Sequence, residues 1–164
     1  MGGGARPRTP GVTRDAAVPI RLRPAEERDL DQLRAIEVAS FADPWSVEGF
    51  RDMMANARAR MDVADDGNGA VLGYTAAWYV ADQAEIANLA VAPAARRRGI
   101  GSLLLARILE AAATLGAKTV FLEVRESNTA AQRLYASRGF EIAGRRREYY
   151  RRPVEDALIM RCSV

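Results

Sequence analysis

A short run of arginines and glycines, Arg96-Arg97-Arg98-Gly99-Ile100-Gly101, lies between an apolar segment and an amphipathic one. Glycines let a backbone come close to a ligand, and the free N–H groups at a helix N-terminus attract anions. The spacing matches neither the Walker loop, which needs Lys followed by Ser or Thr, nor the three-glycine dinucleotide fingerprint. A solvated basic turn before a helix is the alternative interpretation. We predict that this R-x-x-G-x-G loop binds a diphosphate through its main-chain amides.

Two further side chains have the chemistry of an acid–base pair. Glu123 lies in the run Val120-Phe121-Leu122-Glu123-Val124, where every other side chain is apolar. A carboxylate in a covered strand loses hydration and becomes a candidate general base, whereas an ion pair with Arg125 or a water-exposed strand end would give it no such role. Tyr135 follows Leu134 in a predicted helix. Its phenol is a candidate proton donor to a departing thiolate, although most buried tyrosines only fill a core.

The chain contains no histidine. This excludes a Ser-His-Asp triad, a Cys-His pair and a His-ligated zinc, so a general base must be Glu, Asp, Tyr or Lys, and we expect no metal. The single cysteine, Cys162, has no intrachain partner, which makes an oxidising compartment unnecessary and the cytoplasm the expected location. Tyr149 and Tyr150 are expected either to line a groove for an extended peptide or to form a pair on a sheet surface.

Length and composition predict one soluble globular domain. The 164 residues are 49% hydrophobic and 27% charged, and no apolar run approaches the roughly 18 residues that span a bilayer. The net charge of +3 is modest, so we expect neither membrane association nor direct nucleic-acid binding. Residues 1–19 are rich in Gly, Pro and Arg and are predicted to be a disordered arm before a domain over 20–164.

The periodicity of apolar residues predicts a mixed α/β sheet, of the α+β kind. Expected strands cover residues 20–23, 61–64, 70–80, 85–91, 118–124, 140–143 and 156–161. Helices are expected from residue 29 to before Asp43-Pro44, after Ser46, from Ile100 along a stripe that reaches Leu115, and from Ser127 or Asn128 to Gly139. The early strands form an antiparallel meander, and the third helix returns the chain to a parallel strand. Residues 145–155 are expected to connect the last two strands.

Three of these segments, taken in order, resemble the GNAT acetyltransferase superfamily. They are Asn88-Leu89-Ala90-Val91, the Arg-Gly loop, and Leu122-Glu123-Val124-Arg125-Glu126-Ser127-Asn128. Within it the chain resembles the RimI-type N-terminal protein acetyltransferases over residues 20–160. That likeness lies in Asp43-Pro44-Trp45-Ser46, in Leu134-Tyr135-Ala136-Ser137-Arg138-Gly139-Phe140, and in Tyr149-Tyr150 followed by Glu155-Asp156-Ala157.

The resemblance implies a sheet of about seven strands with about four helices, splayed between the fourth and fifth strands where acetyl-CoA enters. It implies cofactor contacts from Leu89, Ala90 and Val91 to the pantetheine, from Arg96, Arg97, Arg98, Gly99, Ile100, Gly101 and Ser102 to the pyrophosphate, and from Asn128 and Tyr135. Glu123 would be the general base and Tyr135 the general acid, with Glu85 as a rival base. The loop from Phe41 to Trp45 and the segment with Tyr149 and Tyr150 would form two walls of an acceptor groove.

The implied reaction is direct transfer of an acetyl group from acetyl-CoA to a protein N-terminus, in particular the N-terminal alanine of ribosomal protein S-eighteen. An α-amino group has a pKa of about 7.7 to 8.0, so a carboxylate acting through water suffices as the base. Because one fold hosts many acceptors, a lysine side chain or a small amine is the alternative substrate. A non-catalytic module that binds a partner or RNA is the third possibility.

Overall fold

The computed structural model describes residues 18–164, so the predicted arm over residues 1–19 lies outside the described chain except for Val18 and Pro19. The strands are β1 (Arg21–Pro24), β2 (Ala59–Asp65), β3 (Val71–Val80), β4 (Gln83–Val91), β5 (Thr119–Arg125), β6 (Glu141–Arg151) and β7 (Val154–Ser163). The α-helices of the described chain are α1 (Leu30–Ser40), α2 (Val47–Ala55), α3 (Ile100–Thr114) and α4 (Thr129–Ala136). Short 3-10 turns, η1 (Glu27–Asp29) and η2 (Pro93–Ala95), precede α1 and α3.

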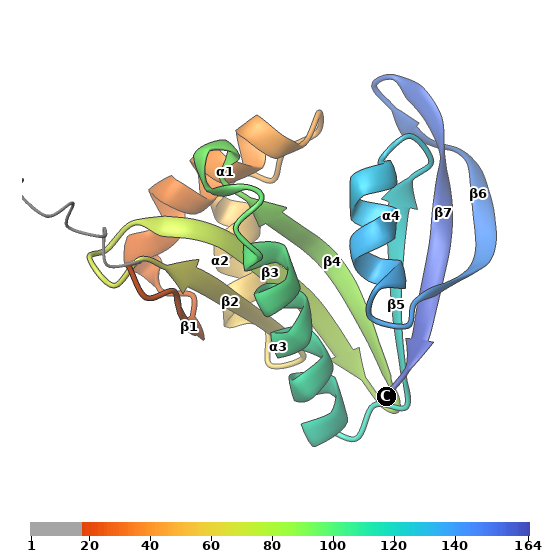
Figure 1. Cartoon of the computed structure of the whole chain (residues 1–164), viewed down its shortest axis with the longest axis horizontal. Helices are drawn as coiled ribbons and strands as arrows, with labels where there is room; N and C mark the ends of the chain where they lie inside the picture. Colours follow the sequence, from red (N-terminus) through yellow and green to blue (C-terminus); the bar gives the residue numbers. More distant parts are fainter. Residues whose placement is uncertain (1–17) are drawn as a thin grey trace, which may run out of the picture.

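All seven strands form one sheet in the order β1-β2-β3-β4-β5-β7-β6 (Figure 1). Neighbouring strands are antiparallel except β4 and β5, which are parallel and are joined through α3. A parallel pair requires such a crossover, because a short turn can only reverse the chain direction. The mixed sheet and the four helices confirm the predicted fold class. No helix between residues 18 and 164 is both long and apolar enough to cross a membrane.

The sheet opens between β4 and β5. Pairing is limited to Gln83–Ile86 of β4 against Thr119–Leu122 of β5, and the strands diverge beyond it (Figure 1). The register of β3 against β4 shifts at this point, since Ala76 pairs with Asn88 while Ala77 pairs with Ile86, which leaves Ala87 as a bulge. A bulge bends its strand and increases the local twist. The bulge therefore turns the second half of β4 away from β5.

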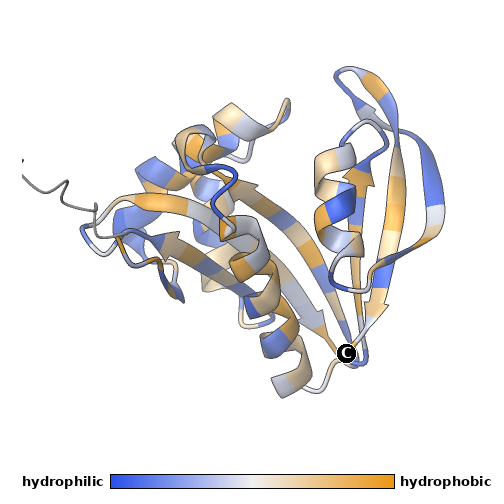
Figure 2. Cartoon of the chain, viewed as in Figure 1, coloured by the Kyte–Doolittle hydropathy of each residue, from blue (hydrophilic) through white to orange (hydrophobic). Residues whose placement is uncertain are grey.

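Helices cover both faces of the sheet. On one face, α3 and α4 bury an apolar cluster that includes Leu105, Ile108, Leu122 and Tyr135. On the other face, a second cluster is built by α1 and α2 on β2 and β3, with Leu33, Ile36, Phe50, Met53 and Tyr74 among its buried members. Figure 2 shows β5, which lies next to the opening, as largely hydrophobic. Each helix thus holds one side of the opening in place by burying its apolar stripe on the sheet.

Two local predictions are wrong. Leu115 was expected in the apolar stripe of α3, but it is 57% exposed because the helix ends at Thr114 and the chain turns at Gly116, whose φ is 83°. Most of residues 145–155, expected as a connection, belongs to the hairpin of β6 and β7. The charged run lacks an alternating pattern because β6 is an edge strand with mostly exposed side chains, and its register shifts between Arg146 and Tyr150.

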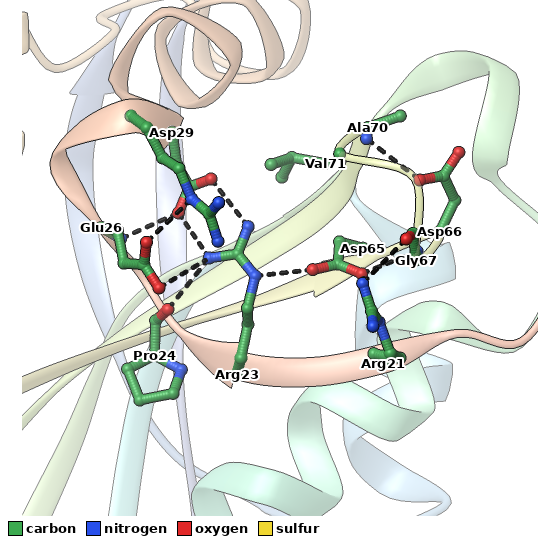
Figure 3. A network of polar contacts seen from close by, with 12 residues as sticks. Arg21, Arg23, Pro24, Glu26, Asp29, Asp65, Asp66, Gly67, Ala70 and Val71 are labelled. Atoms are coloured by element: carbon green, nitrogen blue, oxygen red, sulfur yellow. Dashed lines mark hydrogen bonds and ion pairs between the residues drawn. The ribbon is translucent and has the colours of Figure 1, made fainter.

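An ion-pair network fixes β1 to the rest of the sheet (Figure 3). Both terminal nitrogens of Arg23 donate to the Asp29 carboxylate at 2.8 Å, and its Nε donates to Asp65 at 2.6 Å. The two carboxylates are almost fully buried. Burial is the largest single influence and would raise the pKa of each aspartate, but the hydrogen bonds from Arg23 and from the Glu26 and Gly67 amides, together with the arginine charges, outweigh it, and both pKa values are lowered. The network joins β1, the η1 turn and the end of β2.

Candidate functional site

The Arg-Gly loop lies between the end of β4 and the start of α3, as the sequence predicts. Two left-handed residues shape it, Arg97 with φ 62° and Gly99 with φ 77°. Gly99 is the N-cap of α3 and has no side chain that could accept a hydrogen bond from an amide of the first turn. The first helical hydrogen bond runs from the Leu103 amide to the Gly99 carbonyl, at 3.1 Å. The amides of Gly99, Ile100, Gly101 and Ser102 have no intrahelical acceptor. The loop therefore presents backbone donors to an anion.

The three arginines of this loop are placed differently. Arg96 is anchored, since its Nε donates to the Val91 carbonyl at 3.1 Å and its Nη2 approaches the Ser40 hydroxyl at 3.4 Å. Arg97 and Arg98 are exposed, and Figure 2 shows this loop as strongly hydrophilic. Arg96 thus holds the loop against the end of β4, while Arg97 and Arg98 supply positive charge to its surface.

The second half of β4 has one free backbone edge. Leu89, Ala90 and Val91 pair with β3, but their other side faces the opening because pairing with β5 stops at Ile86. An extended ligand can pair with this edge as an added strand, because its amides can form the hydrogen bonds that a neighbouring strand would form. The predicted contact residues of the pantetheine and of the pyrophosphate therefore follow one another along β4 and into α3.

The helix α4 borders the opening from the β5 side. Gly101 lets α3 and α4 come together, because a Cβ at this position would lie 3.2 Å from Cδ2 of Leu134. Asn128 is exposed, and its Oδ1 accepts from the Ala131 amide at 3.1 Å, so the side chain caps α4. The side-chain oxygen of Asn128 is therefore already used by the helix, and a contact with the cofactor remains a prediction.

A cavity of about 290 Å³ lies on the face opposite to α3 and α4, where β4 and β5 still pair. It is lined by Trp78, Val80, Gln83, Ala84, Glu85, Phe121, Leu122, Glu123, Arg146 and Ile159. Both candidate bases thus border one cavity: Glu123 comes from β5, while Glu85 comes from β4 and pairs with Phe121 in the register. Carboxylates at a cavity can take protons from an amine that enters it.

The environment of Glu123 differs from the apolar enclosure expected from the sequence. Its side chain is 19% exposed, and its Oε1 lies 2.6 Å from Nε of Arg146. The expected partner, Arg125, instead pairs with Glu155 at 3.2 Å. A hydrogen bond between the Tyr149 hydroxyl and Glu123 is the main cause that raises the pKa of Tyr149 to about 12. Glu123 is therefore held at the cavity wall by two residues of β6.

Tyr135 lies on the other face of β5. It is 7% exposed and packs against Phe140, with ring centroids 5.6 Å apart. Burial raises the pKa of Tyr135 to about 12, and the nearby Tyr150 adds to this shift. The phenol is therefore protonated at neutral pH and can donate. The Glu123 side chain lies on one face of β5, and Tyr135 of α4 lies over the other face. A bound group that contacts both side chains must therefore lie at the open edge of β5.

The predicted acceptor residues fall into two groups. Trp45 borders a second cavity, of about 410 Å³, which shares Trp78 with the first cavity. Phe41 is half-buried and packs against the apolar cluster under α1 and α2. Tyr149 and Tyr150 form an edge-to-face pair at 5.1 Å, and the guanidinium of Arg125 lies 4.0 Å from the Tyr150 ring centroid. The structure thus places Trp45 at the wall of one cavity, connects Tyr149 to the other only through Glu123, and uses Phe41 for packing.

Sequence reasoning missed Arg146 and Trp78, both of which line the Glu123 cavity. Arg146 is one of several arginines in the run before Tyr149. The register of the β6–β7 hairpin decides which of them pairs with Glu123. Trp78 reads as an ordinary strand residue. Within residues 18–164, no three His, Cys, Asp or Glu side chains are grouped so that they could hold a metal ion.

Comparison with known proteins decides the family. The model of the acetyltransferase (GNAT) family matches residues 30–140, which include β4, the Arg-Gly loop, α3, β5 and α4. The chain belongs to the GNAT acetyltransferases. The [ribosomal protein bS18]-alanine N-acetyltransferase of Salmonella typhimurium is 38% identical to it over 134 residues, which cover 80% of this chain and 89% of that protein. Members of the GNAT family are acetyl-CoA-dependent acyltransferases, and so is this protein.

Solved structures of this family share the architecture. The ribosomal-protein-S18-alanine N-acetyltransferase of Escherichia coli superposes with a TM-score of 0.81 at 34% identity, over 88% of this GNAT chain and 94% of that one. NAA60 of Arabidopsis thaliana, solved in complex with acetyl-CoA, has a TM-score of 0.79 over 89% of this chain and 99% of its own. Its identity is 20%, so this second likeness is one of fold alone.

Proposed function

We propose that this GNAT protein transfers the acetyl group of acetyl-CoA to the α-amino group of a protein N-terminus, and that its target is the N-terminal alanine of ribosomal protein S-eighteen. The observation that carries the proposal is the opening between β4 and β5. The free edge of β4 runs from the loop of unpaired amides back to the segment where the two strands pair, and a cavity with two carboxylates lies there. The names of the relatives in Salmonella and Escherichia coli support this acceptor. With a ribosomal target, the proposed site of the reaction is the cytoplasm.

The residues along β4 and α3 are suited to coenzyme A. The backbone of Leu89, Ala90 and Val91 would pair with the amides of the pantetheine. The pyrophosphate would be held by the amides of Gly99, Ile100, Gly101 and Ser102, and the three loop arginines would add positive charge. Asn128 would face the cofactor from the α4 side of the opening. A diphosphate suits this loop because its donors are backbone N–H groups at a helix N-terminus, where no side chain competes for them. Acetyl-CoA supplies the thioester.

Proton transfers are assigned to the two faces of β5. Glu123 takes the proton of the α-ammonium group, directly or through a water, and the amine nitrogen then bonds to the acetyl carbon. As the carbon–sulfur bond breaks, Tyr135 gives its proton to the sulfur, and the nitrogen loses its second proton to water, which leaves a neutral amide. Exchange with solvent then restores the protonated phenol and the ionised carboxylate. Burial raises the pKa of Tyr135 to about 12, so the phenol is protonated at neutral pH. No covalent enzyme intermediate is needed.

The acceptor would enter from the side of the two cavities. Trp45, with Phe41 packed behind it, forms the wall from the loop between α1 and α2, and Tyr149 and Tyr150 form the wall from β6. Trp78 lines both cavities. An extended N-terminus placed there points its amine toward Glu123.

The acceptor is tested with matched peptides and mass spectrometry. One peptide begins with Ala-Arg and has a free N-terminus, the second has the same sequence with a blocked N-terminus, and both contain an internal lysine. We expect acetyl-CoA-dependent modification of the first peptide alone, localised to its α-amino group. Modification of the lysine in both peptides would instead favour a lysine or small-amine acetyltransferase.

A further inference from the structure

Glu37 is a buried carboxylate that takes no part in the proton transfers above. It lies near the end of α1, is 1% exposed, and accepts hydrogen bonds from three sides. The Trp45 amide donates to its Oε1 at 2.9 Å, Nδ2 of Asn88 lies 3.1 and 3.2 Å from its two oxygens, and the Tyr74 hydroxyl donates to Oε2. All of its close partners are neutral donors, so no ion pair accounts for the burial of this charge.

The three donors come from the three segments that shape the opening. Trp45 lies in the loop between α1 and α2, on the acceptor side. Asn88 stands between the bulge at Ala87 and the free edge of β4. Tyr74 lies on β3 and pairs with Ala90 in the sheet. One carboxylate therefore connects the acceptor wall with the strand that would bind the cofactor, across 51 residues of sequence between Glu37 and Asn88.

The three donors need a polar side chain opposite them. Burial raises the pKa of Glu37, and the bonds from Trp45, Tyr74 and Asn88 oppose the shift. An apolar side chain of similar size would fill the space but would leave three donors without an acceptor, which is costly in a protein interior. The neighbouring Arg34 strengthens the same loop, since its Nη1 donates to the Trp45 carbonyl at 2.7 Å. Both polar groups of the Trp45 backbone are thus bound to α1.

We propose that Glu37 is a positioning residue that fixes the acceptor loop at Trp45 relative to the bulged half of β4. It touches neither substrate, because its carboxylate is enclosed by Trp45, Tyr74 and Asn88. It acts by setting the distance between the wall that orients the amine and the strand that orients the thioester. Displacement of reacting groups by about 1 Å can lower a rate by roughly 10²-fold. The inference rests on the proposed function, since it assigns the two walls to the two substrates.

Two substitutions test it. Glu37→Leu removes the acceptor, whereas Glu37→Gln keeps one oxygen for the Trp45 amide, and its NH2 group can donate to the Tyr74 hydroxyl oxygen. We expect Glu37→Leu to lower kcat by roughly 10²-fold and to raise the KM of the peptide, and Glu37→Gln to recover most of the loss. The matched control is Asp29→Asn, an equally buried acid in the β1 network, which should lower the melting temperature with kcat and KM unchanged below it.

A readout that does not depend on activity is hydrogen exchange at the Trp45 amide. It should be protected in the wild type, exchange faster in Glu37→Leu, and regain protection in Glu37→Gln. If the leucine variant does not fold, Glu37→Met, which likewise has no oxygen acceptor, takes its place. Wild-type kcat and KM in the folded leucine or methionine variant, with faster exchange at the Trp45 amide, would overturn the positioning role. A wild type that modifies only lysine would overturn the proposed acceptor, and the same kinetics would then be measured with that acceptor.

Discussion

Replacement of Glu123 by glutamine tests the assignment of the base. The substitution keeps the size of the side chain and one acceptor oxygen, but it removes the negative charge that Arg146 and Tyr149 contact at the cavity wall. A general base contributes at least about 10²-fold to a rate, which corresponds to roughly 2.7 kcal/mol. We therefore expect kcat at pH 7 to fall by roughly 10²-fold or more in Glu123→Gln, with the affinity for acetyl-CoA retained.

The effect on folding should be much smaller than the effect on the rate. The ion partner Arg146 is 57% exposed, and pairs that are open to solvent contribute about 0–1 kcal/mol after screening. For a chain of this size, 1 kcal/mol changes the melting temperature by about 2–4 °C. Loss of activity without a larger loss of thermal stability would thus identify a chemical role. Glu141→Gln, an exposed glutamate on β6, is the control and should leave both quantities unchanged.

The pH dependence sharpens this test. An α-amino group with a pKa of about 7.7 to 8.0 is roughly 10% deprotonated at pH 7 and more than about 90% at pH 9. If Glu123 removes the proton from the bound ammonium group, the deficit of Glu123→Gln should shrink by roughly 10-fold over this range. Steady-state release of free thiol measures it. A wild-type rate at pH 7 would refute the assignment, and a parallel loss in Glu85→Gln would move the role to β4.

Three other results are expected. Tyr135→Phe should lower kcat by roughly 10²-fold and leave acetyl-CoA binding intact, because the buried phenol loses its proton but not its packing; an unchanged kcat in rapid-quench assays would remove the acid role. Arg23→Met should lower the free energy of unfolding, measured by urea denaturation, by about 3–5 kcal/mol, because the nearly buried carboxylates of Asp29 and Asp65 lose their main partner. A decrease below about 1 kcal/mol would contradict the network in Figure 3. In acid, both aspartates have lowered pKa values, so their stabilisation is present above the ordinary aspartate pKa and is lost as pH falls through the folded values; Asp29→Asn should flatten this slope of stability against pH.

Much of the fold could be predicted from local sequence patterns. The apolar runs of β3 and β5, the glycine after α3 and the caps at Ser46 and Asn128 are set by nearby residues, and the structure has each of them. The Arg-Gly loop was also predictable, because its glycines and its place before a helix define it. The resemblance to the GNAT superfamily and the mixed sheet are confirmed.

Contacts between distant segments could not be predicted from the sequence. The bulge at Ala87 opens the sheet, yet alanine at this position carries no signal for it. The partner of Glu123 is Arg146 because of the register of the β6–β7 hairpin, whose charged edge strand lacks alternation. Glu37 reads as one polar residue on an amphipathic helix. Its donors at positions 45, 74 and 88 meet only in the folded chain.

The most direct test of the account is to observe the backbone amides of the loop while coenzyme A binds. In two-dimensional NMR spectra of nitrogen-labelled protein, saturating coenzyme A should shift the amide resonances of Gly99, Ile100, Gly101 and Ser102 together with those of Leu89–Val91. Pantetheine, which lacks the diphosphate, should shift the β4 resonances and leave the loop unchanged. Saturable binding of coenzyme A that leaves the Gly99–Ser102 amides unmoved, or no binding by the folded protein, would contradict the account.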